Sequence, residues 1–169
     1  WRSWFVRGAY LLIAFAAAAT LWLVLELAGA EDAIAVIAWI TVPISVLTAA
    51  YTAFLFCQAP GRELWQTWVY LPHLLARSAI GGAAAWLIVV AVADTEREVH
   101  SVLAVVLAGG LAVSVLATAI EFARRDTVHL ERASALALSG RLAPLFWGGI
   151  GGGHVPPAIL IAVYLAAGA

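Results

Sequence analysis

Two basic side chains, His73 and Arg77, stand inside a long apolar segment of the sequence. They lie within the run from Trp68 to Ala93, and residues i and i+4 share one face of a helix. A permanent cation inside hydrocarbon costs at least roughly 2.5–3.5 kcal/mol, and such residues usually face a bundle interior and mark a substrate, ion or proton path. The alternative is a structural arginine that bonds to carbonyls and to a carboxylate of a neighbouring helix.

Tyr51 is the hydroxyl-bearing side chain that we expect at the depth of His73. Each residue lies about five positions inside the end of its apolar segment, or about 8 Å below the membrane surface at 1.5 Å per residue. A tyrosine hydroxyl and an imidazole at one depth can bind the two carbonyls of a quinone or relay its protons. The alternatives are an interfacial tyrosine and a histidine whose bonds are satisfied within the bundle.

His154 stands in the last apolar segment, at a depth that resembles that of Arg77. It follows the glycine-rich residues 148–153 and precedes Pro156 and Pro157, and this composition weakens a helix and frees backbone carbonyls. Such backbone is tolerated inside a membrane only where protein or a water cavity satisfies it. The sequence therefore predicts either a discontinuous helix beside a proton or ion path, or close helix packing on small residues.

Two carboxylates, Glu26 and Glu121, lie near span ends on opposite membrane faces. Either they feed protons to a path that Arg77 and His154 form, or they are interfacial carboxylates. The four histidines occupy unlike depths or loops, and because haem b needs two facing histidines at one depth, no haem site is predicted. The single cysteine, Cys57, excludes an internal disulfide and a thiolate metal cage, so we expect no metal site.

The composition indicates a polytopic helical membrane protein. Of the 169 residues, 64% are hydrophobic and 11% charged, which is far from the composition of a soluble domain. Apolar segments long enough to cross about 30 Å of hydrocarbon lie at about residues 8–29, 33–56, 68–93, 101–123 and 142–167. Short joints make sequential helices antiparallel. We therefore predict an all-α membrane fold, an up-and-down transmembrane bundle of about five spans that forms a single domain. The sequence starts at Trp1 and contains no methionine, so we expect it to be part of a longer chain.

The distribution of arginine predicts the orientation in the membrane. Outside the spans only Arg97 lies on one side, and by the positive-inside rule the opposite side is cytoplasmic; that side carries Arg2, Arg7, Arg62, Arg124, Arg125, Arg132 and Arg141. The N-terminus of this sequence is then cytoplasmic, in a multi-pass protein of a bacterial or archaeal cytoplasmic membrane. The alternative is that these arginines dock a partner subunit.

The joint between the fourth and fifth spans is partly amphipathic. Apolar residues recur there at helical spacing, with polar ones between them, which predicts a short helix lying in the membrane interface. The apolar positions are Leu130, Ala133, Leu136 and Ala137, and the polar ones are Glu131, Arg132 and Ser134.

The sequence resembles the NrfD family, the membrane subunits of polysulfide reductase-like molybdenum enzymes. Three segments carry the likeness in order and spacing. The first is Ser3-Trp4-Phe5-Val6-Arg7-Gly8, similar to the family's Ser-Trp-x-x-x-Gly. The second is Tyr51-Thr52-Ala53-Phe54-Leu55, followed by Glu63-Leu64-Trp65 and Leu71-Pro72, where the family has Tyr-Thr-Gly-x-Leu, Pro-Leu-Trp and Leu-Pro. The third is Leu142-Ala143-Pro144-Leu145-Phe146-Trp147.

This resemblance implies a membrane anchor without a redox centre of its own, which binds a quinone such as menaquinone or ubiquinone. It implies electron exchange with a ferredoxin-like iron–sulfur subunit that connects to a molybdopterin-type catalytic subunit. The motif tyrosine lies at the quinone head group in this family, so Tyr51 inherits that role, and the family's first helix has no counterpart here. In the polysulfide reductase type the tyrosine end faces outside. The arginine bias places it inside, which favours a cytoplasmic partner.

Together these observations predict a quinone site at Tyr51, His73 and Arg77, and a proton path through Arg77, His154, Glu121 and Glu26. The second hypothesis is a proton- or ion-translocating module of a respiratory complex without quinone chemistry. The third is a purely structural anchor. Lipid surrounds the chain in all three, and none involves nucleic acid.

Overall fold

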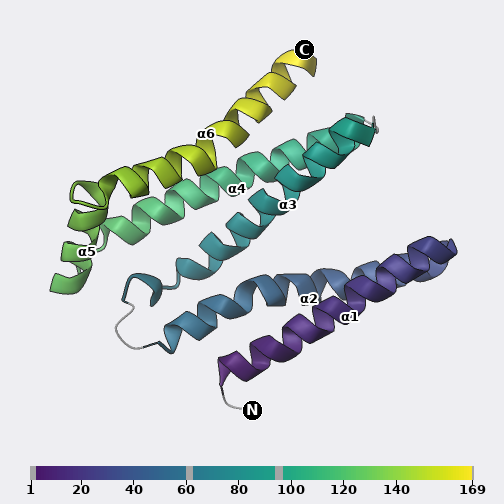
Figure 1. Ribbon diagram of the computed structural model, residues 1–169, viewed down its shortest axis with the longest axis horizontal. Coiled ribbons are helices and arrows are strands. Elements are labelled where there is room, and N and C mark those ends of the chain that lie inside the picture. Colours follow the sequence, from purple (N-terminus) through teal and green to yellow (C-terminus); the bar gives the residue numbers. More distant parts are fainter. Residues whose placement is uncertain (1–2, 60–62, 94–96, 169) are drawn as a thin grey trace. The chain divides into compact units, whose positions relative to one another are not determined.

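The computed structural model describes residues 3–59, 63–93 and 97–168, and every regular element among them is a helix (Figure 1). The elements are α1 (Trp4–Ala28), α2 (Glu31–Cys57), the short 3₁₀ helix η1 (Glu63–Trp65), α3 (Tyr70–Ala93), α4 (Arg97–Ala123), α5 (Val128–Leu138) and α6 (Ala143–Gly168). Five of them are long and apolar enough to cross a membrane, namely α1, α2, α3, α4 and α6. The predicted all-α membrane fold with five spans is therefore confirmed.

The chain divides into two compact units, Trp1–Gln66 and Thr67–Ala169. Each is described by itself, and the single domain over residues 1–169 stays a prediction. Two predicted cytoplasmic arginines, Arg2 and Arg62, lie outside the described residues, and the side chain of Arg97 is not described either.

The first unit is the antiparallel pair α1 and α2. Ser3 caps α1 by accepting a hydrogen bond from the backbone N–H of Phe5, which satisfies one of the donors that a helix start leaves open. Gly29 ends α1 in the left-handed conformation, at φ 67°, a region that glycine enters without steric cost. The chain then turns directly into α2, which begins at Glu31.

Close approach of α1 to α2 depends on Gly8. A Cβ atom added at Gly8 would lie 2.2 Å from Cε2 of Tyr51, so the tyrosine ring occupies the space that any other residue would fill. Near the same end of the pair, the rings of Trp4 and Phe54 stack with centroids 4.5 Å apart, and the backbone N–H of Trp4 donates to Oε1 of Gln58.

The second unit is built on the pair α3 and α4, with α6 along α4 and α5 at the corner between them (Figure 1). The buried positions of α4 recur every three or four residues, as expected for one helix face: Ala104, Leu107, Leu111, Ser114, Ala117 and Glu121. Gly110 lets the pair approach closely, because a Cβ atom there would come within 2.8 Å of Cγ1 of Ile80.

Two expectations about the last elements are wrong. The helix α6 is continuous from Ala143 to Gly168 despite Pro156 and Pro157, so the predicted discontinuity is not found. The close packing of its glycines is not found either, since a Cβ atom at Gly148, Gly149, Gly151, Gly152 or Gly153 would meet nothing within 4 Å. In water, glycine lowers the stability of a helix by about 1 kcal/mol per residue. This cost matters less in a membrane, because there the backbone N–H and C=O groups of a spanning segment must find their hydrogen bonds within a helix.

The predicted short helix between the fourth and fifth spans exists as α5. Leu130 and Ser134 are buried within the second unit, whereas Leu136 is exposed. That α5 lies in the membrane interface with its apolar residues toward lipid stays a prediction.

Candidate functional site

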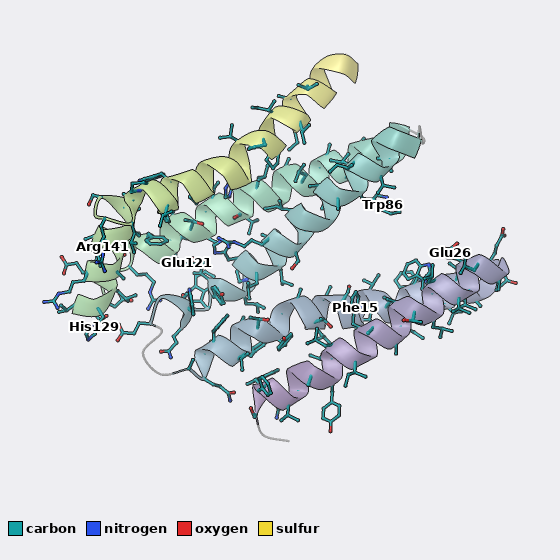
Figure 2. The ribbon with its side chains drawn as sticks, viewed as in Figure 1. Phe15, Glu26, Trp86, Glu121, His129 and Arg141 are labelled. Carbon is teal, nitrogen blue, oxygen red and sulfur yellow. The ribbon has the colours of Figure 1, made fainter. Side chains whose placement is uncertain are left out.

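Four of the predicted site residues meet in the second unit, on α3, α4 and α6. His73 and Glu121 are both buried, and Nδ1 of His73 lies 2.9 Å from Oε1 of Glu121. Figure 2 labels Glu121 on α4. The carboxylate of Glu121 is therefore sequestered between helices and bonded to an imidazole, while its place in a proton path stays a prediction.

Arg77 fixes the protonation pattern of His73. Nε of Arg77 lies 2.9 Å from Nε2 of His73, and a guanidinium N–H can only donate. Nε2 therefore carries a lone pair and Nδ1 carries the proton, which His73 donates to Glu121. A neutral imidazole thus joins a permanent cation to a carboxylate, an arrangement that offsets the cost of a charge inside the membrane.

The Arg77 side chain is otherwise exposed. Its bond to His73 uses one of the five N–H donors that a guanidinium carries. The prediction that Arg77 faces a bundle interior holds for the Nε atom, while the rest of the group lies against a cavity.

A hydroxyl group links this cluster to α6. Oγ of Ser114, which is 1% exposed, lies 3.1 Å from Nε2 of His154 and 3.4 Å from Nε2 of His73. Because both imidazoles reach one hydroxyl, the expectation that the histidines occupy unlike depths is wrong for this pair. His100 and His129 also lie on helices, α4 and α5, rather than in loops.

Ser114 was missed in the sequence. The signal was present, since Ser114 and Glu121 are seven positions apart on α4 and residues at that spacing share a helix face. A lone serine in an apolar span is common, however, and only the positions of α3 and α6 show what its hydroxyl touches.

A cavity of about 470 Å³ borders all of these side chains. Its polar wall is formed by His73, Arg77, Ser114, Glu121 and His154, together with Thr118. Its apolar lining includes Leu145, Phe146 and Ile150 from α6 and Phe122 from α4. A smaller apolar cavity of about 190 Å³ shares four of its lining residues, Thr118, Phe122, Phe146 and Ile150.

The other two predicted site residues belong to the first unit. Tyr51 is half-buried with its ring against Gly8, and no hydrogen bond joins its hydroxyl to another described residue of that unit. Glu26 is exposed near the end of α1 (Figure 2) and accepts a hydrogen bond from Nε1 of Trp22, one turn earlier. The role of Glu26 in a proton path stays a prediction.

The donor set of the cluster is imidazole, guanidinium, hydroxyl and carboxylate. Among the described residues, no group of three or more histidine, cysteine, aspartate or glutamate side chains could hold a metal ion. The cluster is therefore suited to hydrogen bonding and proton movement at the wall of a cavity.

Comparison with protein families gives a match over nearly the whole chain. Residues 1–167 match the family described as polysulphide reductase, NrfD. The chain belongs to the NrfD family. It is accordingly a multi-pass membrane protein of the kind that serves as the membrane subunit of polysulfide reductase-type complexes. Neither the curated proteins nor the solved structures that were searched contain a match.

The NrfD motifs have a structural explanation in the first unit. Ser3 caps α1, Trp4 stacks on Phe54, and Gly8 makes room for the ring of Tyr51. The Ser-Trp-x-x-x-Gly and Tyr-Thr segments are therefore two halves of one helix–helix contact.

Proposed function

We propose that this NrfD chain is the quinone-interacting membrane anchor of a respiratory oxidoreductase complex. The observation that carries the proposal is the cavity of about 470 Å³ between α3, α4 and α6, whose lining combines the polar side chains of His73 and Arg77 with apolar and aromatic ones. Ligand sites of this kind combine apolar walls with a few convergent polar groups.

The cavity residues suit a quinone head group. Its carbonyl oxygens need hydrogen-bond donors, and Arg77 supplies several from an exposed guanidinium. Its ring needs an apolar wall, which Phe122 and Phe146 offer. The quinone, a menaquinone or a ubiquinone, supplies the two-electron, two-proton redox chemistry that the side chains of this chain lack.

The named residues divide the remaining work. Arg77 orients and polarises the head group, while His73 holds a proton at Nδ1 against Glu121 and presents Nε2 to the cavity side. His154 extends the proton path on α6. Tyr51, from the motif segment of the first unit, contributes a hydroxyl to quinone binding.

Electrons come from or go to partner subunits. We propose a ferredoxin-like iron–sulfur subunit as the direct partner and a molybdopterin-type catalytic subunit beyond it, in keeping with the NrfD family. The partner docks on the arginine-rich face, which the positive-inside rule makes cytoplasmic.

The test is quinol-dependent turnover of the intact complex that contains this chain. We expect Tyr51→Phe and Arg77→Leu each to lower turnover severalfold or more, while the complex assembles and its soluble subunits keep activity with an artificial electron carrier. Tyr10→Phe, at an exposed tyrosine of α1, is the matched control for Tyr51→Phe and should leave turnover unchanged. Unchanged turnover in both test variants would sink the proposal.

A second candidate function is proton translocation without quinone chemistry. The polar groups from Glu121 through His73 and Ser114 to His154 favour it, since their hydrogen-bond contacts form one continuous chain between helices. In that case Arg77→Leu abolishes pumping by the complex in proteoliposomes and leaves electron transfer intact. A structural anchor instead assembles poorly with this variant but keeps its specific activity once assembled.

A further inference from the structure

Both imidazoles of the cluster have one nitrogen whose role is fixed by its partner. Nδ1 of His154 lies 3.0 Å from the carbonyl oxygen of Ile150, which only accepts, so Nδ1 carries a proton. In His73, Nε2 accepts a hydrogen bond from Arg77, so Nδ1 carries the proton and donates it to Glu121. In each ring Nε2 is therefore the nitrogen that can take up an additional proton.

The two Nε2 atoms converge on one hydroxyl. Ser114 Oγ is 3.1 Å from Nε2 of His154 and 3.4 Å from Nε2 of His73. A hydroxyl donates one proton and accepts through two lone pairs, so it can accept from one imidazole while it donates to the other. Ser114 is nearly inaccessible, and this protects the exchange from bulk solvent.

We propose that the Ser114 hydroxyl transfers protons between His154 and His73, and that Arg77 gates the transfer. The gate follows from the geometry, since Nε2 of His73 accepts either the Nε–H of Arg77 or a proton by way of Ser114. This inference deepens the proposed function, on which it rests, by naming the residue that connects the cavity to α6.

The transfer conserves protons at each step. Protonated His154 gives its Nε2 proton to Ser114 Oγ, and Ser114 gives its own hydroxyl proton to Nε2 of His73. His73 then passes its Nδ1 proton to Glu121, so one proton moves from His154 to the carboxylate and Ser114 is restored. Arrival of the proton at Nε2 of His73 displaces the guanidinium, whose Nε–H becomes available to the cavity.

The charged and titratable groups around Ser114 come from three helices. Helix α3 supplies His73 and Arg77, α4 supplies Glu121, and α6 supplies His154. Tyr70, at the start of α3, interacts electrostatically with both Arg77 and Glu121. Any dependence of the transfer on pH is therefore set jointly by these groups.

The test compares Ser114→Ala with Ser114→Thr in the intact complex. Thr41→Val in α2 is the matched control. It too removes a buried hydroxyl, but the hydroxyl of Thr41 bonds to the carbonyl oxygen of Ile37 and not to an imidazole. We expect Ser114→Ala to slow proton uptake by the complex in proteoliposomes on the order of tenfold or more, while Ser114→Thr restores it and Thr41→Val leaves it unchanged. Solvent deuterium should slow the wild type, and the isotope effect should change in Ser114→Ala.

A second readout needs no turnover. In the resting complex labelled with ¹⁵N-histidine, solid-state NMR should show Nδ1–H forms for His73 and His154, assigned with His→Gln variants. Ser114→Ala should shift the Nε2 resonance of His154 toward that of a free lone pair. Unchanged Nε2 resonances, or proton uptake equal to the wild type in Ser114→Ala, would overturn the inference. If turnover responds to neither Tyr51→Phe nor Arg77→Leu while these resonances do shift, the quinone proposal fails and the relay stands.

Discussion

At the scale of single residues, His73 holds the site together. It is the only described residue that bonds to both the cation and the carboxylate of the cluster, through its two ring nitrogens. The permanent charge of Arg77 dictates the tautomer, and the tautomer dictates which nitrogen exchanges protons. The protonation pattern of this site therefore follows from the need to pair a cation inside the membrane, and not from a catalytic sequence motif.

Removing the carboxylate should destabilise the second unit. We expect Glu121→Ala to lower the free energy of unfolding by about 3 kcal/mol, because it leaves the His73 and Arg77 pair without a counter-charge. Glu121→Gln keeps an acceptor for the Nδ1–H of His73 and should lose less. Thermal denaturation of the complex in detergent measures both; equal melting temperatures for wild type and Glu121→Ala would contradict the buried pair.

Removing the hydroxyl of Ser134 should not destabilise the second unit. This side chain is fully buried on α5, and its Oγ has no hydrogen-bond partner among the residues that the structure describes. Such a group costs about 1–3 kcal/mol in desolvation. We expect Ser134→Ala to leave the melting temperature unchanged or to raise it slightly. Leu130→Ala, at a buried apolar position of the same helix, should lower it, and a lower value for Ser134→Ala would show that the hydroxyl has a partner.

At the scale of elements, contacts between neighbouring helices position the candidate residues. The ring of Tyr51 sits where Gly8 lacks a side chain, and α3 approaches α4 at Gly110. In a membrane the hydrophobic effect does not drive helices together, so close approach at small residues contributes much of their association. The glycines of α6 differ, because no described residue of the second unit would lie within 4 Å of a Cβ atom added at Gly148, Gly149, Gly151, Gly152 or Gly153.

Substitution of Gly8 should therefore displace Tyr51. We expect Gly8→Ala to separate α1 from α2, to lower thermal stability and to reduce quinol-dependent turnover if Tyr51 contacts the quinone. Gly148→Ala is the control, since its added methyl meets open space on α6. A melting curve for each variant and one turnover assay suffice, and identical behaviour of the two variants would argue against the packing role of Gly8.

At the scale of the whole molecule, most large apolar side chains face outward. Leu27 in α1, Trp39 in α2 and Trp68 before α3 are each at least 80% exposed, and every spanning helix carries further exposed large apolar side chains. In water such surfaces would drive aggregation, whereas in a bilayer they contact lipid. This fold therefore requires a lipid environment around its apolar surface.

The orientation of the chain in that membrane can be tested with its own cysteine. Cys57 is the one cysteine of the sequence, is exposed, and ends α2 on the side with most arginines. If that side is cytoplasmic, a membrane-impermeant maleimide should label Cys57 in inside-out vesicles and spare it in right-side-out vesicles. Cys57→Ser is the control for labelling elsewhere. The reverse result would place the arginine-rich face, and a partner docked on it, outside.

The sequence by itself determined the class of protein, the spans and the helical elements, because hydrocarbon allows an uninterrupted apolar segment little choice but a helix. It also identified the family and the residues that membrane physics makes expensive, His73 and Arg77 among them. Only the tertiary structure decided that Glu121 is buried, that α6 is unbroken, and that Ser114 joins two imidazoles. Those facts depend on which helix faces meet and at what height, and a local pattern of residues carries no information about the side chains of another helix.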